Sequence, residues 1–315
     1  MKINLITSTA RPTEKQFEEF KKLGDFKIID AQKWSAYEVI ANAADTEILV
    51  AGTSGVQEIS RDLLFGLKNL KYISTLTVGM DWVDLKSAQE LNIPISNIKG
   101  ANSESVAEHT WGMILDLSKR ITEFNRDAIS KGAYKFGDYR GIEVYGKTIG
   151  IIGLGDIGKK VARIAHGFDM KVLGTNKSGN QVEGIQLVDL PTLLKNSDVI
   201  VVCVPYTSET NNIIDKHQVD LMKEGVIIIN PARPEMTNKQ AILEGLGTGK
   251  IYGFGIETEI MQPISKDDPY LTHPRIIATP HNAFNTIDAE IKSFDTVVDN
   301  IKAFLGGNPQ NIVRL

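Results

Sequence analysis

Three glycines stand between a predicted apolar strand and a predicted amphipathic helix. The segment is Thr148-Ile-Gly-Ile-Ile-Gly-Leu-Gly-Asp-Ile-Gly158. In such a turn the first glycine permits the tight bend, the second lets backbone N–H groups approach a pyrophosphate, and the third lets the helix pack against the strand. The helix N-terminus adds unpaired donors and the positive end of a dipole. The segment therefore predicts a dinucleotide-binding turn made by Gly153, Gly155, Asp156, Ile157 and Gly158.

The next predicted strand, near residues 171–174, ends in polar residues rather than in a carboxylate. An NAD-binding unit usually has an acidic residue about 20 positions beyond the turn, which accepts a hydrogen bond from the ribose 2′-OH. Here the chain continues with Asn176, Lys177 and Ser178. These three residues can accommodate a 2′-phosphate, although they could also form a plain polar turn. We predict that they favour NADP(H), with NAD(H) as the alternative.

Short apolar strands alternate with amphipathic helical segments along almost the whole chain. This alternation predicts parallel sheets covered by helices. Strands are expected near residues 3–6, 26–29, 48–50, 72–75 and 93–96, and a second series begins at residue 148. A long helix is predicted over Ser103–Arg120. The last helical segment, Thr286–Leu305, has no strand after it and is expected to return to the first domain. The sequence therefore predicts an α/β protein with two doubly wound parallel-sheet domains.

The composition excludes several classes of protein. The chain has 315 residues, which suggests two domains, and its 35 Lys+Arg and 39 Asp+Glu give a net charge of −4. Scattered charges of both signs argue against a nucleic-acid groove or a membrane-surface patch. No apolar run approaches the roughly 18 residues that span a bilayer, and the N-terminus lacks the features of a signal peptide. The single cysteine, Cys203, lies in an apolar run, and the histidines lack ligand spacing, so no metal site is predicted. We expect a cytoplasmic protein with a small-molecule partner.

Six segments, in order along the chain, match one known family. They are Val78-Gly-Met-Asp-Trp-Val-Asp84, Asn102-Ser-Glu-Ser-Val-Ala-Glu-His109, the glycine turn of residues 146–158, Val204-Pro-Tyr-Thr-Ser-Glu-Thr210, Asn230-Pro-Ala-Arg233 and Thr279-Pro-His-Asn-Ala-Phe284. Through them the chain resembles the D-isomer-specific 2-hydroxyacid dehydrogenases over nearly its whole length. The resemblance implies a Rossmann dinucleotide-binding domain (residues 100–285) inserted into a discontinuous flavodoxin-like substrate domain (residues 1–99 and 286–315). It also implies a homodimer formed through the region 100–150, including Lys119, Arg120 and the loop 134–145.

The resemblance assigns roles to individual residues. Arg233 would bind the substrate carboxylate and polarise the carbonyl, which suits a guanidinium because its donors form a fork. His281 would be the general acid/base, which suits an imidazole because its pKa lies near neutrality. Backbone amides of Val78 and Gly79 would also hold the carboxylate. The implied cofactor-binding residues beyond the glycine turn are Val204, Pro205 and Thr210 on the adenosine side, Glu257 at the nicotinamide carboxamide, and Ala232 and His281.

The sequence departs from the family pattern at the partner of the histidine. The usual Leu-Asp-x-x-x-x-Glu-Pro run corresponds here to Ile256-Glu-Thr-Glu-Ile-Met-Gln-Pro263, so Glu257 replaces an aspartate and Gln262 replaces the catalytic glutamate. Gln262 can orient His281 by hydrogen bonding but supplies no charge, so His281 should titrate at a lower pH than in its relatives. Beside Arg233, Pro234 replaces a glycine, and proline restricts the preceding arginine to extended geometry.

We predict an oxidoreductase that transfers hydride between NADP(H) and a small 2-keto or 2-hydroxy acid, D-specific, with glyoxylate or hydroxypyruvate as the model substrate. Two alternatives stay open. Formate dehydrogenases of this family pair a glutamine with the histidine and have an asparagine that matches Asn102, and formate oxidation needs no general acid. The other alternative is a non-catalytic NADP(H)-binding regulator, since fold alone does not establish activity. The presence of Arg233 and His281 argues against the regulator.

Overall fold

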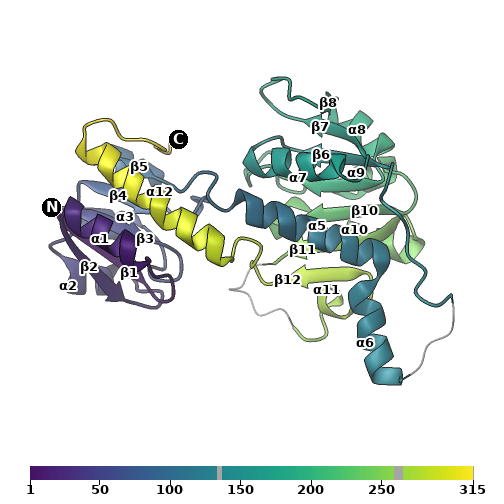
Figure 1. Cartoon of the computed structure of the whole chain (residues 1–315), viewed down its shortest axis with the longest axis horizontal. Coiled ribbons are helices and arrows are strands. Elements are labelled where there is room, and N and C mark those ends of the chain that lie inside the picture. Colours follow the sequence, from purple (N-terminus) through teal and green to yellow (C-terminus); the bar gives the residue numbers. More distant parts are fainter. Residues whose placement is uncertain (133–136, 259–264, 315) are drawn as a thin grey trace. The chain divides into compact units, whose positions relative to one another are not determined.

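The computed structural model describes residues 1–132, 137–258 and 265–314, and the chain divides into two compact units (Figure 1). Unit 1 consists of Met1–Asn102 and Thr286–Leu315, and unit 2 consists of Ser103–Asn285. The last helix, α12 (Ile287–Leu305), belongs to unit 1, as expected from the sequence. Among the described residues no helix is both long and apolar enough to cross a membrane.

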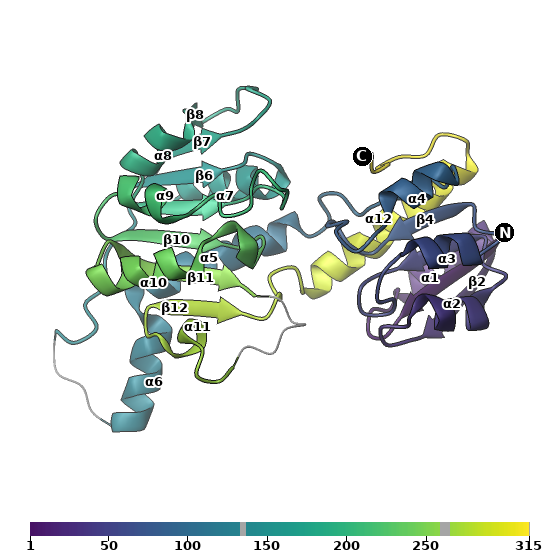
Figure 2. The same cartoon turned by 180° about the vertical axis from the view of Figure 1, so that it is seen from behind.

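Unit 1 is a five-stranded parallel sheet in the order β2-β1-β3-β4-β5. This is the flavodoxin-like order, and the predicted fold class is confirmed. Helices α1 and α12 cover one face and helices α2 and α3 the other (Figures 1 and 2). The elements are β1 (Lys2–Thr7), α1 (Glu14–Leu23), β2 (Asp25–Asp30), α2 (Ala36–Ala43), β3 (Ile48–Ala51), α3 (Arg61–Gly66), β4 (Tyr72–Thr75), α4 (Leu85–Glu90), β5 (Ile95–Ser96) and α12.

Unit 2 is a seven-stranded parallel sheet in the order β12-β11-β10-β9-β6-β7-β8. Counted from β6, this is the doubly wound Rossmann order with one further strand, which confirms the predicted domain type. Its central strands are continuous apolar runs because helices bury both faces of the sheet. The strands are β6 (Thr148–Ile152), β7 (Lys171–Thr175), β8 (Gln186–Leu187), β9 (Val199–Val202), β10 (Val226–Asn230), β11 (Ile251–Glu257) and β12 (Ile276–Thr279).

The helices of unit 2 pack on both faces of this sheet (Figures 1 and 2). One hydrophobic cluster joins α5 and α7 to the sheet, and a second joins α8, α9 and α10 to its other face. The helical segments are α5 (Ser103–Lys119), α6 (Ile121–Lys131), α7 (Asp156–His166), α8 (Leu190–Asn196), α9 (Lys216–Leu221), η1 (Pro234–Met236), α10 (Lys239–Thr248) and α11 (Pro269–Thr272).

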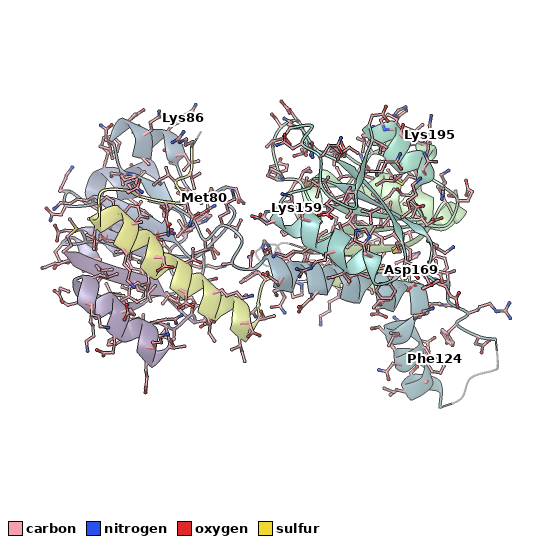
Figure 3. The ribbon with its side chains drawn as sticks, turned by 45° about the horizontal axis from the view of Figure 1, so that its top comes forward. Met80, Lys86, Phe124, Lys159, Asp169 and Lys195 are labelled. Carbon is pink, nitrogen blue, oxygen red and sulfur yellow. The ribbon has the colours of Figure 1, made fainter. Side chains whose placement is uncertain are left out.

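The predicted helix over Ser103–Arg120 ends one residue early, and a second helix, α6, follows it directly. Arg120 separates the two because it adopts a left-handed conformation with φ of 58°. Its Nε donates to Glu123 Oε2 at 2.6 Å, and its guanidinium carbon lies 4.9 Å from the ring centre of Tyr139. These contacts favour a conformation that a non-glycine residue rarely adopts. The sequence analysis did not identify α6, which also bears Phe124, labelled in Figure 3.

Candidate active site

The functional segments of unit 2 all follow strands of one parallel sheet. Parallel strands end on the same side, so the residues after β6, β7, β9, β10, β11 and β12 lie along one edge (Figures 1 and 2). The strand order reverses between β6 and β9. In open α/β sheets, ligands bind outside the carboxyl ends of the strands at such a switch point.

The glycine turn after β6 is shaped by close packing. Gly153 has φ of 100°, and a Cβ atom there would lie 2.7 Å from both the carbonyl oxygen of Cys203 and a methyl group of Val204. A Cβ atom at Gly158 would overlap the carbonyl oxygen of Gly153. By contrast, nothing lies within 4 Å of the same position at Gly155. The first and third glycines are therefore required by packing, and the second leaves open space beside the turn.

The turn leads into α7 with its donors unused. Gly155 is the N-cap of α7 and provides no side-chain cap. Within the described part of the chain, no backbone hydrogen bond uses the N–H groups of Gly155, Asp156 or Ile157. An uncapped helix N-terminus beside open space fits an anion such as a pyrophosphate. The residues present therefore fit a dinucleotide cofactor.

Val204, Pro205 and Thr210 form a second turn, which follows β9. The Thr210 hydroxyl donates to the carbonyl oxygen of Pro205 at 2.7 Å and accepts from the N–H of Thr207 at 2.8 Å. Because a Cβ atom at Gly153 would touch Val204, this turn lies directly beside the glycine turn. The structure thus brings together two segments that are separated by about 50 residues.

The residues predicted to favour NADP(H) form a polar turn after β7. The Asn176 side chain accepts from the N–H of Gly179 at 2.7 Å and donates to the carbonyl oxygen of Asn180 at 3.0 Å. Ser178 Oγ accepts from the N–H of Asn180 at 3.3 Å. No carboxylate belongs to this turn.

Lys177 has a partner that the sequence analysis missed. Its ammonium group pairs with Glu209, which lies in the Val204–Thr210 turn, and the two side chains are 83% and 68% exposed. The ammonium group lowers the pKa of the Glu209 carboxyl. The predicted phosphate contact of Lys177 therefore faces competition from this carboxylate.

The segment after β10 fixes the backbone of Arg233. The buried Asn230 side chain donates to the carbonyl oxygen of Arg233 at 2.7 Å and accepts from the N–H of Ala232 at 3.1 Å. Arg233 is extended, with φ of −138° and ψ of 141°, which confirms the expected effect of Pro234. Pro234 is the first residue of η1, where its missing N–H costs no hydrogen bond.

Glu257, the last residue of β11, is 2% exposed and satisfied inside unit 2. Its Oε1 accepts from the Thr279 hydroxyl and lies 3.2 Å from His109 Nε2, and its Oε2 accepts from the N–H of Ala283 at 2.9 Å. Burial favours the neutral acid, but the hydrogen bonds from His109, Thr279 and Ala283 outweigh it, so the pKa of Glu257 lies below its ordinary value. We call Glu257, His109, Thr279 and the backbone of Ala283 the Glu257 network.

His281 lies between Thr279 and Ala283. It has a left-handed φ of 49°, its N–H donates to the carbonyl oxygen of Thr279 at 3.0 Å, and its ring meets that of Phe284 edge-on at 5.8 Å. Gln262, the expected partner of His281, lies outside the described residues. The Gln262–His281 pair and its effect on the titration of His281 therefore stay predictions.

In unit 1, Val78 and Gly79 follow β4 and keep their donors available. The carbonyl oxygens of Val78 and Gly79 accept from the side chains of Asn97, at 3.0 Å, and Trp82, at 3.2 Å. Among the described residues, no backbone carbonyl accepts from the N–H of Val78, Gly79 or Met80. Met80 is labelled in Figure 3. A turn with engaged acceptors and available donors suits a carboxylate.

Sequence reasoning missed His109 and Thr279 as members of the site. Both lie inside segments already singled out, His109 at the end of the segment 102–109 and Thr279 two residues before His281. The signal that could have identified them is a polar residue at the carboxyl end of a buried strand, together with a histidine on the helix that covers it. The described residues bring together no group of His, Cys, Asp or Glu side chains that could hold a metal ion.

Comparison with known proteins gives a consistent result. Residues 111–283 match the family model described as D-isomer specific 2-hydroxyacid dehydrogenase, NAD binding domain. Hydroxypyruvate reductase of Blautia hydrogenotrophica is 30% identical over 313 residues, which cover 96% of each protein. D-3-phosphoglycerate dehydrogenase of Archaeoglobus fulgidus is 31% identical over 311 residues, which cover 97% of this chain and 58% of that protein. The chain thus spans less than two thirds of the length of this longer relative.

The fold also matches solved structures over the whole chain. The structure described as "Acyclic imino acid reductase (Bsp5) in complex with NADPH and D-Arg" superimposes with a TM-score of 0.89 and 29% identity, and the match covers 100% of both chains. That protein was solved with NADPH, whereas the matching family model is named for NAD. The comparisons thus include both nicotinamide cofactors.

Proposed function

The chain belongs to the D-isomer specific 2-hydroxyacid dehydrogenase family, and on that premise we propose that it transfers hydride between NADP(H) and a small 2-keto or 2-hydroxy acid of D configuration. One observation supports this proposal above all others. A single sheet edge of unit 2 bears the uncapped glycine turn, Arg233 and His281. A regulator without turnover would need the turn but not the other two residues.

The proposed roles follow from the chemistry of the groups. When bound, the nicotinamide cofactor supplies or accepts the hydride at the keto carbon. Arg233 holds the substrate carboxylate with two parallel donors and polarises the carbonyl oxygen. His281 donates a proton to the alkoxide that forms there, and removes it in the reverse direction. The available N–H groups of Val78 and Gly79 are proposed as further donors to the carboxylate.

We propose NADP(H) as the preferred cofactor because the turn after β7 contains an amide, an ammonium group and a hydroxyl but no carboxylate. A 2′-phosphate would compete with the Glu209 carboxylate for Lys177. The phosphate has the advantage because it is a dianion, whereas the carboxylate has a single negative charge. The solved imino acid reductase with NADPH is compatible with this choice.

A second candidate is the reduction of a 2-imino acid. It is suggested by the neighbour of 29% identity, which is named an imino acid reductase and was solved with D-Arg. Such a substrate shares the carboxylate and the trigonal carbon of a 2-keto acid, so Arg233 could bind both. The difference lies in the atom protonated, which is nitrogen in one case and oxygen in the other.

One panel of assays tests these proposals. NADPH and NADH are each offered with glyoxylate, hydroxypyruvate, pyruvate and phenylpyruvate, with and without ammonium, and NADP⁺ and NAD⁺ are offered with formate. We expect oxidation of NADPH by at least one keto acid without ammonium. Turnover that requires ammonium would favour the imino acid, turnover of formate alone would favour formate oxidation, and tight NADPH binding without turnover would favour a regulator.

We also propose a homodimer formed through the region 100–150. In that region the apolar side chains of Ile121 and Ile129 of α6 are 57% and 76% exposed, and a dimer formed there would bury them. Light scattering should then give twice the mass of the 34.7 kDa chain. A monomeric mass at micromolar concentration would contradict this proposal.

A further inference from the structure

The carboxylate of Glu257 holds both flanks of His281. One oxygen accepts from the side chain of Thr279, two residues before the histidine, and the other accepts from the backbone N–H of Ala283, two residues after it. His281 itself has a left-handed φ of 49°, a conformation that costs a non-glycine residue roughly 1 kcal/mol and persists only where neighbours enforce it. The two bonds from Glu257 span the strained residue.

The hydrogen bonds of the Glu257 network also define the role of His109. The Thr279 hydroxyl has one proton, which it donates to Glu257 Oε1. Its oxygen, 3.1 Å from His109 Nε2, must therefore accept, so that nitrogen bears a proton. The same nitrogen lies 3.2 Å from Glu257 Oε1. His109 thus supplies a third donor to a carboxylate that is 2% exposed.

Helix α5 anchors the same loop from its other side. The Ser105 hydroxyl donates to the carbonyl oxygen of Ala283 at 2.6 Å, and both residues are buried. Ala283 is therefore fixed at its N–H by Glu257 and at its carbonyl by Ser105. Helix α5 contributes both Ser105 and His109, so it determines the position of the loop at two points.

We propose that Glu257, oriented by His109, is a positioning residue for His281 and acts through Thr279 and Ala283. This role differs from the contact with the nicotinamide carboxamide that the resemblance implies, because it acts through two protein donors of unit 2, the Thr279 hydroxyl and the Ala283 N–H. The inference rests on the proposed function only in taking His281 as the acid. Donors from three residues face the two oxygens, and an ionised carboxylate can accept from all of them.

The first test is spectroscopic and needs neither cofactor nor turnover. The chain has five histidines, so the ring signals of ¹³C-histidine-labelled protein can be resolved and that of His281 assigned from its absence in H281N. In E257Q an amide N–H₂ replaces one acceptor, and in T279V the hydroxyl is lost. We expect the His281 signal to shift and broaden in both variants, and to stay as in the wild type in T279S and in E244Q, an exposed glutamate on α10.

The second test separates positioning from cofactor contact. Affinities of E257Q for NADPH and for 2′-phospho-ADP-ribose, which lacks the nicotinamide, are measured by titration. Positioning predicts that both affinities change by the same factor. A selective loss of affinity for NADPH would show that Glu257 contacts the carboxamide and would overturn the inference.

The third test is kinetic and uses the keto acid identified by the panel. Misplacing an acid by about 1 Å can cost on the order of 100-fold, so kcat should fall about 10- to 100-fold in E257Q and T279V. T279S keeps the hydroxyl and should recover most of the kcat that T279V loses, and the exposed E244Q should leave kcat unchanged. If E257Q does not fold, the T279V and T279S pair decides. An unchanged His281 signal in T279V overturns the inference, whereas a wild type without turnover overturns the proposed function and leaves the spectroscopic test valid.

Discussion

In unit 2, the carboxyl ends of the parallel strands form one edge of the sheet, and the two ends of this edge are built differently. At β11 and β12 the Glu257 carboxylate is buried, its partners His109 and Thr279 are half-buried, and both of its oxygens accept from donors of other segments. After β7, the turn of Asn176, Lys177 and Ser178 is satisfied mainly by its own backbone. Within the described part of the chain, the exposed Lys177–Glu209 pair links it to another segment. One end is held by tertiary contacts, and the other is held by local ones.

This difference predicts how strongly substitutions at each end should affect the protein. Removing one partner from a buried charged network leaves the others unsatisfied and costs much more than the interaction itself contributes. An exposed ion pair is worth between about 0 and 1 kcal/mol. We therefore expect substitutions near His281 to abolish or severely reduce activity, and substitutions at the ribose end to adjust cofactor choice. Four predictions test this contrast, and the largest effect comes first.

Replacing the acid itself should have the largest effect. In H281N, kcat for reduction of the keto acid should fall about 10²- to 10⁴-fold, the usual contribution of a positioned general acid. Binding of NADPH should be preserved because the glycine turn is untouched. Stopped-flow and steady-state assays across pH measure the loss, with the exposed His217→Asn as the matched control. A kcat near that of the wild type would exclude His281 as the acid.

Replacing the guanidinium should have the next largest effect. R233K keeps the charge but loses the fork of donors. Stabilisation of the transition state should weaken by about 2 kcal/mol, which lowers kcat/KM for the keto acid roughly 30-fold. R163K, at an exposed position of α7, is the control. If both variants behave alike, a carboxylate contact through Arg233 is ruled out.

The Glu257 network should make the stability of unit 2 sensitive to acid. A carboxyl whose pKa is lowered by folding stabilises the native state above its unfolded pKa, about 4.3, and this contribution is lost as the pH falls through the folded pKa. Among the described residues, His109 is the titratable side chain in contact with Glu257. The free energy of unfolding should therefore fall less steeply below about pH 5 in E257Q than in the wild type.

This stability can be measured for unit 2 alone. Trp111 lies in unit 2, whereas Trp34 and Trp82 lie in unit 1, so a background with W34F and W82F reports unfolding of unit 2 by fluorescence. Urea titrations between pH 3 and pH 7 then compare the wild-type background with E257Q and E244Q. Parallel pH profiles for wild type and E257Q would contradict the lowered pKa of Glu257.

The smallest effect is expected at the ribose end. K177A should raise KM for NADPH and E209Q should lower it, each by up to about fivefold, because the pair is exposed and solvent weakens its attraction. KM for NADH should change little in either variant. The measurement is KM for both cofactors at low and at high salt, since salt screens exposed charges. Equal or better turnover with NADH in the wild type would reject the preference for NADP(H).

The sequence was sufficient to predict the fold and most segments of the sheet edge. Continuous apolar strands such as β9 and β10 occur where helices bury both faces, and the carboxyl ends of parallel strands share one edge whatever the details of packing. The glycine turn was predicted from its place between a strand and a helix, and Arg233 and His281 from the family resemblance. The strand order of unit 2 then brings their segments to one edge of the sheet.

Side-chain partners could not be predicted in the same way. Glu257 is the last residue of an apolar strand, and nothing in that pattern indicates that its oxygens lie against His109 and Ala283 rather than against a ligand. The break at Arg120 was missed because its left-handed conformation depends on Glu123 and Tyr139, not on a glycine. These features arise from tertiary contacts between residues that periodicity does not relate.

The transfer of hydride to a keto carbon is tested most directly by following the label. Hydroxypyruvate or pyruvate is used, because the product of glyoxylate has no D or L form to separate. The purified protein is incubated with this keto acid and with NADPH that bears deuterium on the transferable position of the nicotinamide. The product is analysed by mass spectrometry and chiral chromatography. The account predicts a D-2-hydroxy acid with one deuterium at C2. An L product, or NADPH that binds but transfers no deuterium to any member of the substrate panel, would contradict it.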